Sequence, residues 1–394
     1  MENFVFEYPT KVYFGKGVAK ENLGKELLKY GENVMIAYGG GSIKKNGVYE
    51  EIVGIVKNSG KIITEFSGIM PNPTYEKVLE GAKLAKENSI DFILAVGGGS
   101  VIDCCKIIAM QAKMDEDLWE LEIEQGKFPY IAPIPMGAIV TVSGTGSEMN
   151  GGAVITNEEN KIKTGLYGGA PKFAILDPMY TMSVPEKQVI SGAFDTLSHT
   201  METYFGYPNE NNVSDDISEA IMRNTIRNIR ILLKDMSNYT ARSNLMWDSA
   251  MAENGILKIG KRTDFEVHHM EHQLGAYTDC NHGQGLAVLH PVYYRHIYNY
   301  GLPKFISFAV NVWGISKDGK SDEDLALAGI EALENFIKEC GLPTSLHELK
   351  MKKDASLLLT DETLKAIAYS TNISQGSYKK MTKEEIYQIF KECL

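Results

Sequence analysis

Two glycine-rich loops of identical composition constrain the fold of this chain more than any other feature of its sequence. Gly-Gly-Gly-Ser occurs at residues 39–42 and again at 97–100, each time after a short apolar run and before a helix-compatible segment. Glycine lets a backbone approach a phosphate closely, and the amides that start the next helix favour an anion. A tight strand-to-helix turn would use the same residues. Two such loops are better explained by one extended ligand with a pyrophosphate, although neither matches G-x-G-x-x-G.

The first half of the chain alternates short β-branched runs with amphipathic segments. The expected strands are 34–37, 61–66, 92–96 and 131–135, and the expected helices between them include 74–88 and 101–112. Strands that alternate with helices predict parallel β-α-β units in a doubly wound sheet. Two further runs, 152–156 and 162–166, flank a polar tetrapeptide and predict a hairpin inserted after the sheet.

The pattern changes near Pro185, which suits the first position of a helix. Beyond it helical periods dominate, roughly over 185–206, 214–236, 240–258, 264–276, 283–297, 322–340, 361–372 and 382–393. We therefore expect residues 1–184 to form a Rossmann-like α/β domain with a mostly parallel sheet, and residues 185–394 to form an all-helical domain. The absence of a low-complexity linker predicts a packed interface, with a ligand cleft between the two.

Composition narrows the class of protein. The 394 residues carry a net charge of −11 without a Lys/Arg cluster, which argues against nucleic acid as a partner. Five cysteines without C-x-x-C spacing predict reduced thiols in a cytoplasmic protein. The first residues lack the pattern of a signal peptide. The uncharged stretch 130–147 contains two prolines and three glycines, so we expect a buried strand and a loop there, and no membrane span.

A histidine-rich block at 268–282 holds four of the chain's eight histidines. His268 and His272 are four residues apart in a helical stretch, so they share one face of the helix. His282 follows ten residues later beside a glycine. The spacing alone does not decide whether His268, His269 or His272 would be a ligand.

A carboxylate and an imidazole have the same helical spacing in an earlier segment. Asp195 and His199 share one face of the helix expected after Pro185. A lone pair of this kind is usually a surface pair. Together with the histidine block, however, it supplies one carboxylate and three imidazoles, which suit Zn²⁺ or Fe²⁺. The sequence therefore predicts a divalent metal centre in the helical half.

These pieces, in this order, resemble the iron-containing alcohol dehydrogenase family, in particular its butanol dehydrogenase-like (group III) branch. The match runs over nearly the whole chain and includes Pro9-Thr10, Phe14-Gly15-Lys16-Gly17, Pro71-Asn72-Pro73, Gly97 to Asp103, Thr145 to Glu148, Leu176-Asp177-Pro178, Asp195 to His199, His268 to His272 and Asn281-His282-Gly283. The resemblance implies a dehydroquinate synthase-like architecture, with a dinucleotide-binding α/β domain, a helical domain and the metal between them.

The resemblance also implies roles for single residues. It makes Asp195, His199, His268 and His282 the metal ligands and part of the catalytic set. His272 would lie near the nicotinamide and the substrate, and we expect it to relay a proton. The residues expected at the dinucleotide, from the loops and the resemblance together, are Gly39, Gly40, Ser42, Asn72, Gly97, Gly98, Gly99, Ser100, Asp103, Thr141, Thr145 and the hairpin lysine Lys163, with Lys161 as its alternative.

The expected reaction is a metal-dependent transfer of hydride between NAD(P)(H) and a small primary alcohol or aldehyde, such as butanol or butanal. The turn 38–42 offers no acidic residue to read a ribose 2′-hydroxyl. Ser42, Lys44 and Lys45 instead suit a 2′-phosphate, so NADP(H) is favoured and NAD(H) is the alternative. The metal, Fe²⁺ or Zn²⁺, stays open.

Other functions would account for fewer of these features. A glycerol-type polyol dehydrogenase would share the fold, and a dehydroquinate synthase-like lyase would need several cations around its substrate. Apolar neighbours of the histidine block, Phe265, Leu274 and Tyr277, favour a small apolar substrate. A metal-dependent hydrolase or a non-catalytic metal-binding protein would leave the glycine loops unexplained. The resemblance further implies a homodimer, joined near Val12 and Phe14.

Overall fold

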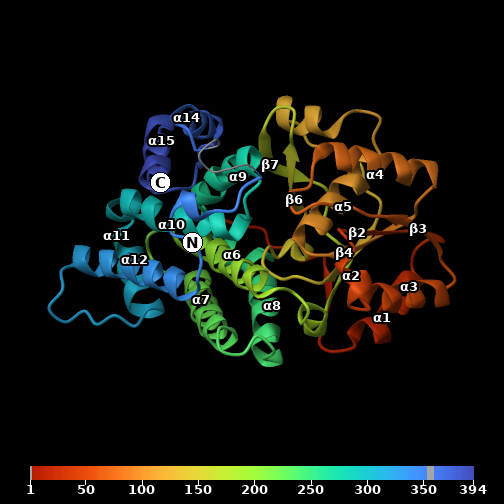
Figure 1. Ribbon diagram of the computed structural model, residues 1–394, viewed down its shortest axis with the longest axis horizontal. Coiled ribbons are helices and arrows are strands. Elements are labelled where there is room, and N and C mark those ends of the chain that lie inside the picture. Colours follow the sequence, from red (N-terminus) through yellow and green to blue (C-terminus); the bar gives the residue numbers. More distant parts are fainter. Residues whose placement is uncertain (1, 353–358) are drawn as a thin grey trace. The chain divides into compact units, whose positions relative to one another are not determined.

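The computed structural model describes residues 2–352 and 359–394. Its chain divides into two compact units, Tyr8–Pro185 on one hand and Met1–Glu7 with Glu186–Leu394 on the other. Strands and helices alternate in the first unit (Figure 1). In the described part of the second unit, all the named elements are helices. The expected combination of an α/β half and an all-helical half is therefore confirmed.

A parallel sheet of six strands forms the core of the first unit, in the order β1-β8-β5-β4-β2-β3. Its strands are β1 Lys11–Phe14, β2 Asn33–Tyr38, β3 Ile62–Phe66, β4 Phe92–Gly97, β5 Met136–Val140 and β8 Phe173–Leu176. Every residue of β4 and β5 is buried, as is typical of a parallel sheet that is covered on both faces. The carboxyl ends of parallel strands lie at one edge of the sheet, so the loops that follow them converge there.

The helices of this unit follow the strands. They are α1 Val18–Leu27, α2 Ser42–Lys45, α3 Val48–Asn58, α4 Tyr75–Glu87 and α5 Gly99–Gln111. The side chain of Thr74 accepts a hydrogen bond from the amide of Lys77 and thereby caps α4. Nearly all of α5 is buried, which agrees with its mostly apolar sequence.

The strand expected at 131–135 is wrong. These residues are irregular, and the strand lies five residues later, at Met136–Val140. The prolines at 133 and 135 lack the N–H group that a ladder of hydrogen bonds needs. The observed strand contains Gly137, which weakens its sequence pattern. A Cβ there would lie 2.4 Å from Cζ of Phe173, so the glycine makes room for this ring on the neighbouring strand.

The predicted hairpin is confirmed, with β6 Gly152–Asn157 antiparallel to β7 Ile162–Tyr167. It is tied back to the loop that precedes α4. The amide of Thr156 donates to the carbonyl of Pro73 at 2.9 Å, and Thr156 also forms a bridge with Thr74. Lys163 stands opposite Thr156 in the hairpin register. Strand β6 therefore lies between this lysine and the loop at 71–73.

The second unit is a bundle of helices. They are α6 Glu186–Tyr204, α7 Val213–Leu232, α8 Tyr239–Glu253, α9 Glu266–Thr278, α10 His282–Ile297, α11 Leu302–Ser307, α12 Asp322–Glu339, α14 Asp361–Ser370 and α15 Lys383–Glu392. Most of α6 is buried, including every residue from Ala193 to Tyr204, so this helix forms the centre of the unit. Within the described ranges, none of the helices has the length and apolar character that crossing a membrane requires.

A buried ion cluster fixes the start of α7. The carboxylate of Asp215 pairs with the ammonium groups of Lys261 and Lys304, and all three side chains have 0% exposure. The same carboxylate accepts a hydrogen bond from the amide of Asn212, as part of a capping box. The cluster thus joins α7 to α11 and to the segment that precedes α9.

Candidate nucleotide loops and candidate metal centre

The two glycine loops lie at the carboxyl ends of adjacent strands. Residues 39–42 follow β2 and residues 97–100 lie at the end of β4, and these strands pair in register. The polar loop 141–148 follows β5, the other neighbour of β4. The structure therefore brings the two glycine loops and the loop that carries Thr141 and Thr145 to one edge of the sheet.

Gly98 and Gly99 are needed because the loop 97–100 lies against the polar loop 141–148. A Cβ at Gly99 would lie 2.2 Å from Oγ1 of Thr145, and a Cβ at Gly98 would lie 3.2 Å from Cβ of Val142. Gly99 is also the first residue of α5, whose first turn contains no acidic side chain. The first amides of a helix have no carbonyl partner within it, and together with the helix dipole they favour an anion. This helix start suits a pyrophosphate.

Other residues expected at the dinucleotide surround this edge. The hydroxyl of Ser100 donates to the carbonyl of Pro71, next to Asn72, and the amide of Thr141 donates to the carbonyl of Gly97 at 2.9 Å. The two candidate lysines differ in setting. Lys163 is buried in β7, whereas Lys161 lies in the hairpin turn with a φ of 52°. The remaining positions, in the turn after β2, are Gly39, Gly40 and Ser42, the last of which begins α2.

Asp103 directs its carboxylate to groups inside the unit. It accepts hydrogen bonds from the hydroxyl of Ser147 and from the amide of Val154, and lies 3.5 Å from Nζ of Lys106. Lys106 has 0% exposure and also donates to Ser147 and to the carbonyl of Gly152. This network ties α5 to the polar loop and to the hairpin. The sequence did not reveal it, because a lysine in a helix usually reaches solvent.

We expect Gly99→Ala to weaken nicotinamide binding. The new methyl group would collide with Thr145, and their separation would push the polar loop away from the start of α5. The KM for the reduced nicotinamide should rise by about tenfold, which corresponds to ~1.4 kcal/mol of binding, while kcat changes little. Steady-state kinetics measures this. Gly54→Ala on α3 is the matched control, since its Cβ would meet no described atom within 4 Å. Equal KM values for both variants would contradict the prediction.

Glu148 makes the stability of the first unit depend on pH. Burial raises the pKa of this carboxyl to about 7 from 4.5. Between pH 4.5 and about 7, Glu148 retains its proton in the folded protein and has lost it in the unfolded chain. The free energy of unfolding therefore falls as pH rises through this range. Glu148→Gln should remove the penalty, which is on the order of 3 kcal/mol at pH 8. Calorimetry should show its Tm about 5 °C above wild type at pH 8 and unchanged near pH 4.5. A difference that did not vary with pH would refute this assignment.

The turn after β2 has an acidic neighbour that the sequence did not indicate. Glu65 on β3 accepts hydrogen bonds from the hydroxyls of Tyr38 at 2.6 Å and Tyr49 at 2.5 Å, and lies 3.5 Å from Nζ of Lys44. These hydrogen bonds lower the pKa of Glu65. One of the two cations expected at a 2′-phosphate therefore already faces a carboxylate.

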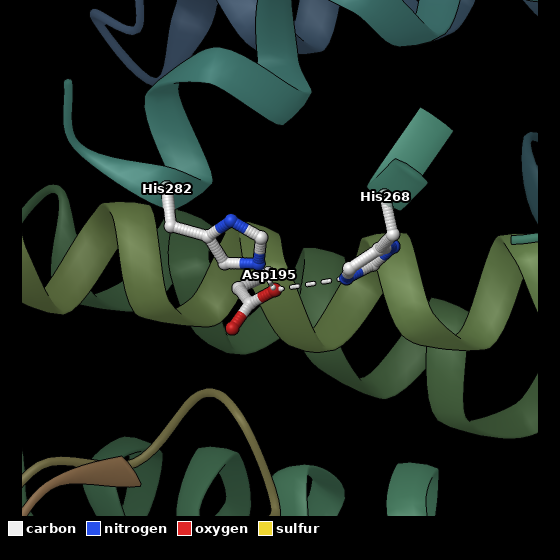
Figure 2. Close-up of side chains that lie close together, drawn as sticks. All are labelled: Asp195, His268 and His282. Carbon is white, nitrogen blue, oxygen red and sulfur yellow. Dashed lines mark ion pairs between the residues drawn. The ribbon is translucent and has the colours of Figure 1, made fainter. Parts of the chain in front are cut away.

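In the helical unit, Asp195 on α6, His268 on α9 and His282 at the start of α10 come together. Figure 2 shows both imidazoles turned toward the carboxylate. Nε2 of His268 lies 3.6 Å and Nε2 of His282 lies 3.5 Å from Oδ1 of Asp195. One ligand atom from each of the three residues lies within 4.8 Å of the other two. Helix α6 and the two consecutive helices α9 and α10 thus present one oxygen and two nitrogens to a common point.

The chemistry of these atoms fits a divalent metal ion. Asp195 and His268 are 3% and 4% exposed. Within residues 2–352 and 359–394, Oδ1 of Asp195 and Nε2 of His268 have no hydrogen-bond partner. Buried polar atoms without partners are costly, and a cation would satisfy them. The mixed oxygen and nitrogen donors are those that Zn²⁺ and Fe²⁺ accept.

His199 and His272 lie beside this set of three. Nδ1 of His199 is 2.9 Å from the backbone carbonyl of Asp195, and its ring centroid lies 4.4 Å from that of His268. His272 belongs to a second set of possible ligands with Glu271 and His282. Of the histidines whose roles the spacing left open, the structure places His268 against Asp195.

The charges of the carboxylates and imidazoles in this site depend on one another. Burial opposes the ionisation of Asp195, but the neighbouring imidazoles of His199, His282 and His268 outweigh it and lower the pKa of the carboxyl. Burial also opposes a charge on His268, yet Glu202 and Asp195 raise its pKa to about 10. Metal binding at these residues therefore competes with protons.

Two buried glutamates behind the imidazoles were missed by the sequence reasoning. Nδ1 of His268 contacts the carboxylate of Glu202, and Nδ1 of His282 contacts that of Glu271. Each glutamate follows a histidine by three residues, as His199-x-x-Glu202 and His268-x-x-Glu271. This repeated H-x-x-E spacing could have singled them out.

Comparisons with known proteins agree over both units. A model described as iron-containing alcohol dehydrogenase matches residues 9–178, and one for the C-terminal part of the same family matches 189–394. The chain is 40% identical over 395 residues to NADH-dependent butanol dehydrogenase A of Clostridium acetobutylicum, with 100% of both chains covered. It is 37% identical over 352 residues to the NADPH-dependent aldehyde reductase YqhD of Escherichia coli, with 88% of this chain and 89% of the relative covered.

A solved structure is also similar to this chain over its whole length. The crystal structure of NADH-dependent butanol dehydrogenase A from Thermotoga maritima superposes with a TM-score of 0.91 at 36% identity, and the match covers 100% of this chain and 99% of that one. The family matches span both the glycine loops and the histidine block, which sets aside the hydrolase, lyase and non-catalytic alternatives. The chain therefore belongs to the iron-containing alcohol dehydrogenase family and is an NAD(P)-dependent oxidoreductase.

Proposed function

We propose that this enzyme interconverts small primary alcohols and aldehydes, such as butanol and butanal. The observation that carries the proposal is the set of Asp195, His268 and His282, whose oxygen and nitrogen ligand atoms lie within 4.8 Å of one another and suit a divalent metal ion. We assign His199, one helical turn after Asp195, as the fourth ligand. A bound Fe²⁺ or Zn²⁺ would supply a Lewis acid for the alcohol or aldehyde oxygen, and the nicotinamide would carry the hydride.

The residues around the site favour an apolar substrate. The ring of Phe265 lies 5.3 Å from that of His268 and 6.2 Å from that of His199, so it forms an apolar wall beside the ligands. Leu274 cannot serve in this way, because its exposure is 0% and it belongs to the core. An apolar wall excludes water and accepts a hydrocarbon chain better than a polyol.

His272 is the proposed proton relay. It is only partly buried, and its ring lies 5.7 Å from that of His282 and 6.0 Å from that of His268. It is therefore close to the proposed ligands while retaining access to solvent, and could pass the proton of the substrate hydroxyl outward. Full turnover with an unchanged pH profile in His272→Ala would exclude this role.

The unit Tyr8–Pro185 is proposed to bind the dinucleotide, with the helix start at Gly98 and Gly99 at the pyrophosphate. Lys163, buried opposite Thr156, is the proposed hairpin lysine. Asp103 would act indirectly, through the network that holds the polar loop. The helical unit, Glu186–Leu394 with the first seven residues, is proposed to carry the metal.

NADP(H) is the proposed preferred cofactor. Ser42 and Lys45 at the two ends of α2 are exposed, so a 2′-phosphate could contact them, and Lys44 joins them despite its ion pair with Glu65. Both nicotinamides occur in the names of the relatives, since the clostridial protein is NADH-dependent and YqhD is NADPH-dependent. The deciding assay therefore uses both nicotinamides.

A homodimer is proposed to form along β1. This strand is at the edge of the sheet, and the side chain of Phe14 is 41% exposed. Edge strands present backbone groups that a second copy can pair with. Light scattering of the purified protein measures the state directly, and a monomer would exclude this proposal.

The deciding experiment measures the oxidation of reduced nicotinamide by butanal. The protein is freed of metal, reloaded separately with Zn²⁺ or Fe²⁺, and assayed with NADPH or NADH. We expect metal-dependent oxidation, faster with NADPH. The four combinations also give the preferred metal. Folded, metal-loaded protein that oxidised neither nicotinamide with butanal, but reduced NAD(P)⁺ with glycerol, would overturn the proposed substrate class.

A further inference from the structure

We propose that Glu202 and Glu271 are positioning residues of the metal centre, each holding one histidine so that its Nε2 faces the metal ion. The inference rests on the proposed metal site and goes beyond its ligands. An imidazole has two nitrogens, and only one can bind a given metal ion. The group that holds the other nitrogen decides the tautomer and the orientation of the ring.

Glu202 holds His268 from the far side of the ring. Its carboxylate has 0% exposure and contacts Nδ1, which leaves Nε2 directed at Asp195. The other carboxylate oxygen accepts hydrogen bonds from the amides of Val267 at 2.8 Å and His268 at 3.3 Å. These amides belong to the first turn of α9. One side chain of α6 therefore fixes both the start of the ligand-bearing helix and the ring that the helix carries.

Glu271 holds His282 in the same way. Its side chain also has 0% exposure, and its contact with Nδ1 leaves Nε2 of His282 directed at Asp195. The start of α10 is shaped to admit this carboxylate. A Cβ at Gly285 would lie 2.9 Å from Cγ of Glu271, and a Cβ at Gly283 would lie 2.1 Å from the carbonyl oxygen of Ser191 on α6. The glycines beside His282 thus let the helix approach both its carboxylate partner and α6.

The third imidazole is held differently, which shows what the carboxylates add. Nδ1 of His199 faces the backbone carbonyl of Asp195, a neutral acceptor within the same helix. Nδ1 is engaged in all three rings, but the carboxylate beside that of His199 is Asp195 itself, 3.4 Å away and part of the proposed ligand set, whereas His268 and His282 each have a second carboxylate behind the ring. A negative partner raises the electron density on the opposite nitrogen and strengthens it as a ligand. These two histidines should accordingly contribute more to metal affinity than His199.

The test measures Zn²⁺ affinity by competition with a chelator in wild type, Glu202→Gln, Glu271→Gln and Glu271→Ala. Glutamine retains an acceptor for Nδ1–H and loses the charge, whereas alanine loses both. We expect Zn²⁺ to bind about 10-fold more weakly to each glutamine variant and about 100-fold more weakly to Glu271→Ala. The visible spectrum of Co²⁺-loaded protein should also shift in these variants, because the ligand field changes.

Glu219→Gln is the matched control. Glu219 is a buried glutamate of the same unit that accepts hydrogen bonds from Tyr204 at 2.8 Å and Asn311 at 3.0 Å, and contacts none of the proposed ligands. Its Zn²⁺ affinity and Co²⁺ spectrum should equal those of wild type. Circular dichroism of the metal-free variants reports folding. If Glu202→Gln does not fold, the two Glu271 variants carry the test.

The outcomes separate this inference from the function on which it rests. Wild-type affinity and an unchanged Co²⁺ spectrum in the folded glutamine and alanine variants would overturn the positioning role while leaving the metal site intact. A wild-type protein that binds neither Zn²⁺ nor Co²⁺ would instead refute the proposed metal centre. Equal weakening in Glu219→Gln would also overturn the inference, because the effect would then belong to any buried glutamate.

Discussion

Asp195→Asn is expected to lose about a thousandfold in kcat/KM, together with most of its bound metal. Oδ1 of this residue is the point toward which both His268 and His282 direct Nε2, so an amide there removes the only anionic ligand of the proposed set. Lewis-acid stabilisation is worth several kcal/mol, and each 1.36 kcal/mol is tenfold in rate. Kinetics with butanal and NADPH, combined with metal analysis, measures both effects.

The control for this variant is Asp235→Asn in the same unit. Asp235 is an exposed residue whose carboxylate accepts hydrogen bonds from Ser237. Its substitution should leave both kcat/KM and metal content unchanged. If Asp195→Asn kept a full complement of metal and lost less than tenfold in kcat/KM, the carboxylate would not be a ligand and the site would have to be rebuilt around the second set of Glu271, His272 and His282.

Asp215→Asn is expected to destabilise the helical unit by about 3–5 kcal/mol. The substitution leaves Lys261 and Lys304, both without exposure, lacking the carboxylate that neutralises them. Breaking a buried ion pair costs this much because the remaining charge has no solvent to stabilise it. For a unit of this size the Tm should fall by about 10 °C. Calorimetry of the metal-free protein measures it without a contribution from bound metal.

Glu339→Gln provides the comparison for a surface pair. Glu339 makes a bidentate contact with Arg230, with distances of 2.8–3.1 Å, but both side chains are more than 40% exposed. Pairs of this kind contribute less than about 1 kcal/mol. A Tm for Asp215→Asn as close to wild type as that of Glu339→Gln would show that the two lysines lose their charges at little cost in the folded protein.

The sequence predicted well the features that depend on a repeating pattern of residues or on residues close together in the chain. Alternating strands and helices identified the α/β half, and helical spacing placed Asp195 on α6 and His268 on α9. These elements depend on local patterns of apolar residues, which the sequence displays directly. The strand at Met136–Val140 was misplaced because its identity depends on a distant partner. Gly137 is suited to a strand only because the ring of Phe173 lies beside it.

The functional residues that were missed depend on contacts between distant segments. Glu202 acts on His268 and Glu271 acts on His282, rather than each on the histidine three residues before it. Glu65 approaches Lys44 because β3 pairs with β2. Such pairings are decided by how helices and strands pack. A buried carboxylate also resembles a surface one in the sequence, since only the fold shows that it is enclosed.

The pairing of β1 with β8 has a consequence for biosynthesis. Lys11 lies opposite Phe173 and Phe14 opposite Leu176, so the first strand of this sheet in chain order pairs with the last one. Strands β2, β3 and β4 can assemble much earlier, because their partners are close in the chain. At about 5–20 residues per second, β1 waits roughly 10–30 s for its neighbour. During that time its apolar side chains and unpaired backbone are exposed, which makes this segment a natural point of chaperone contact in the nascent chain.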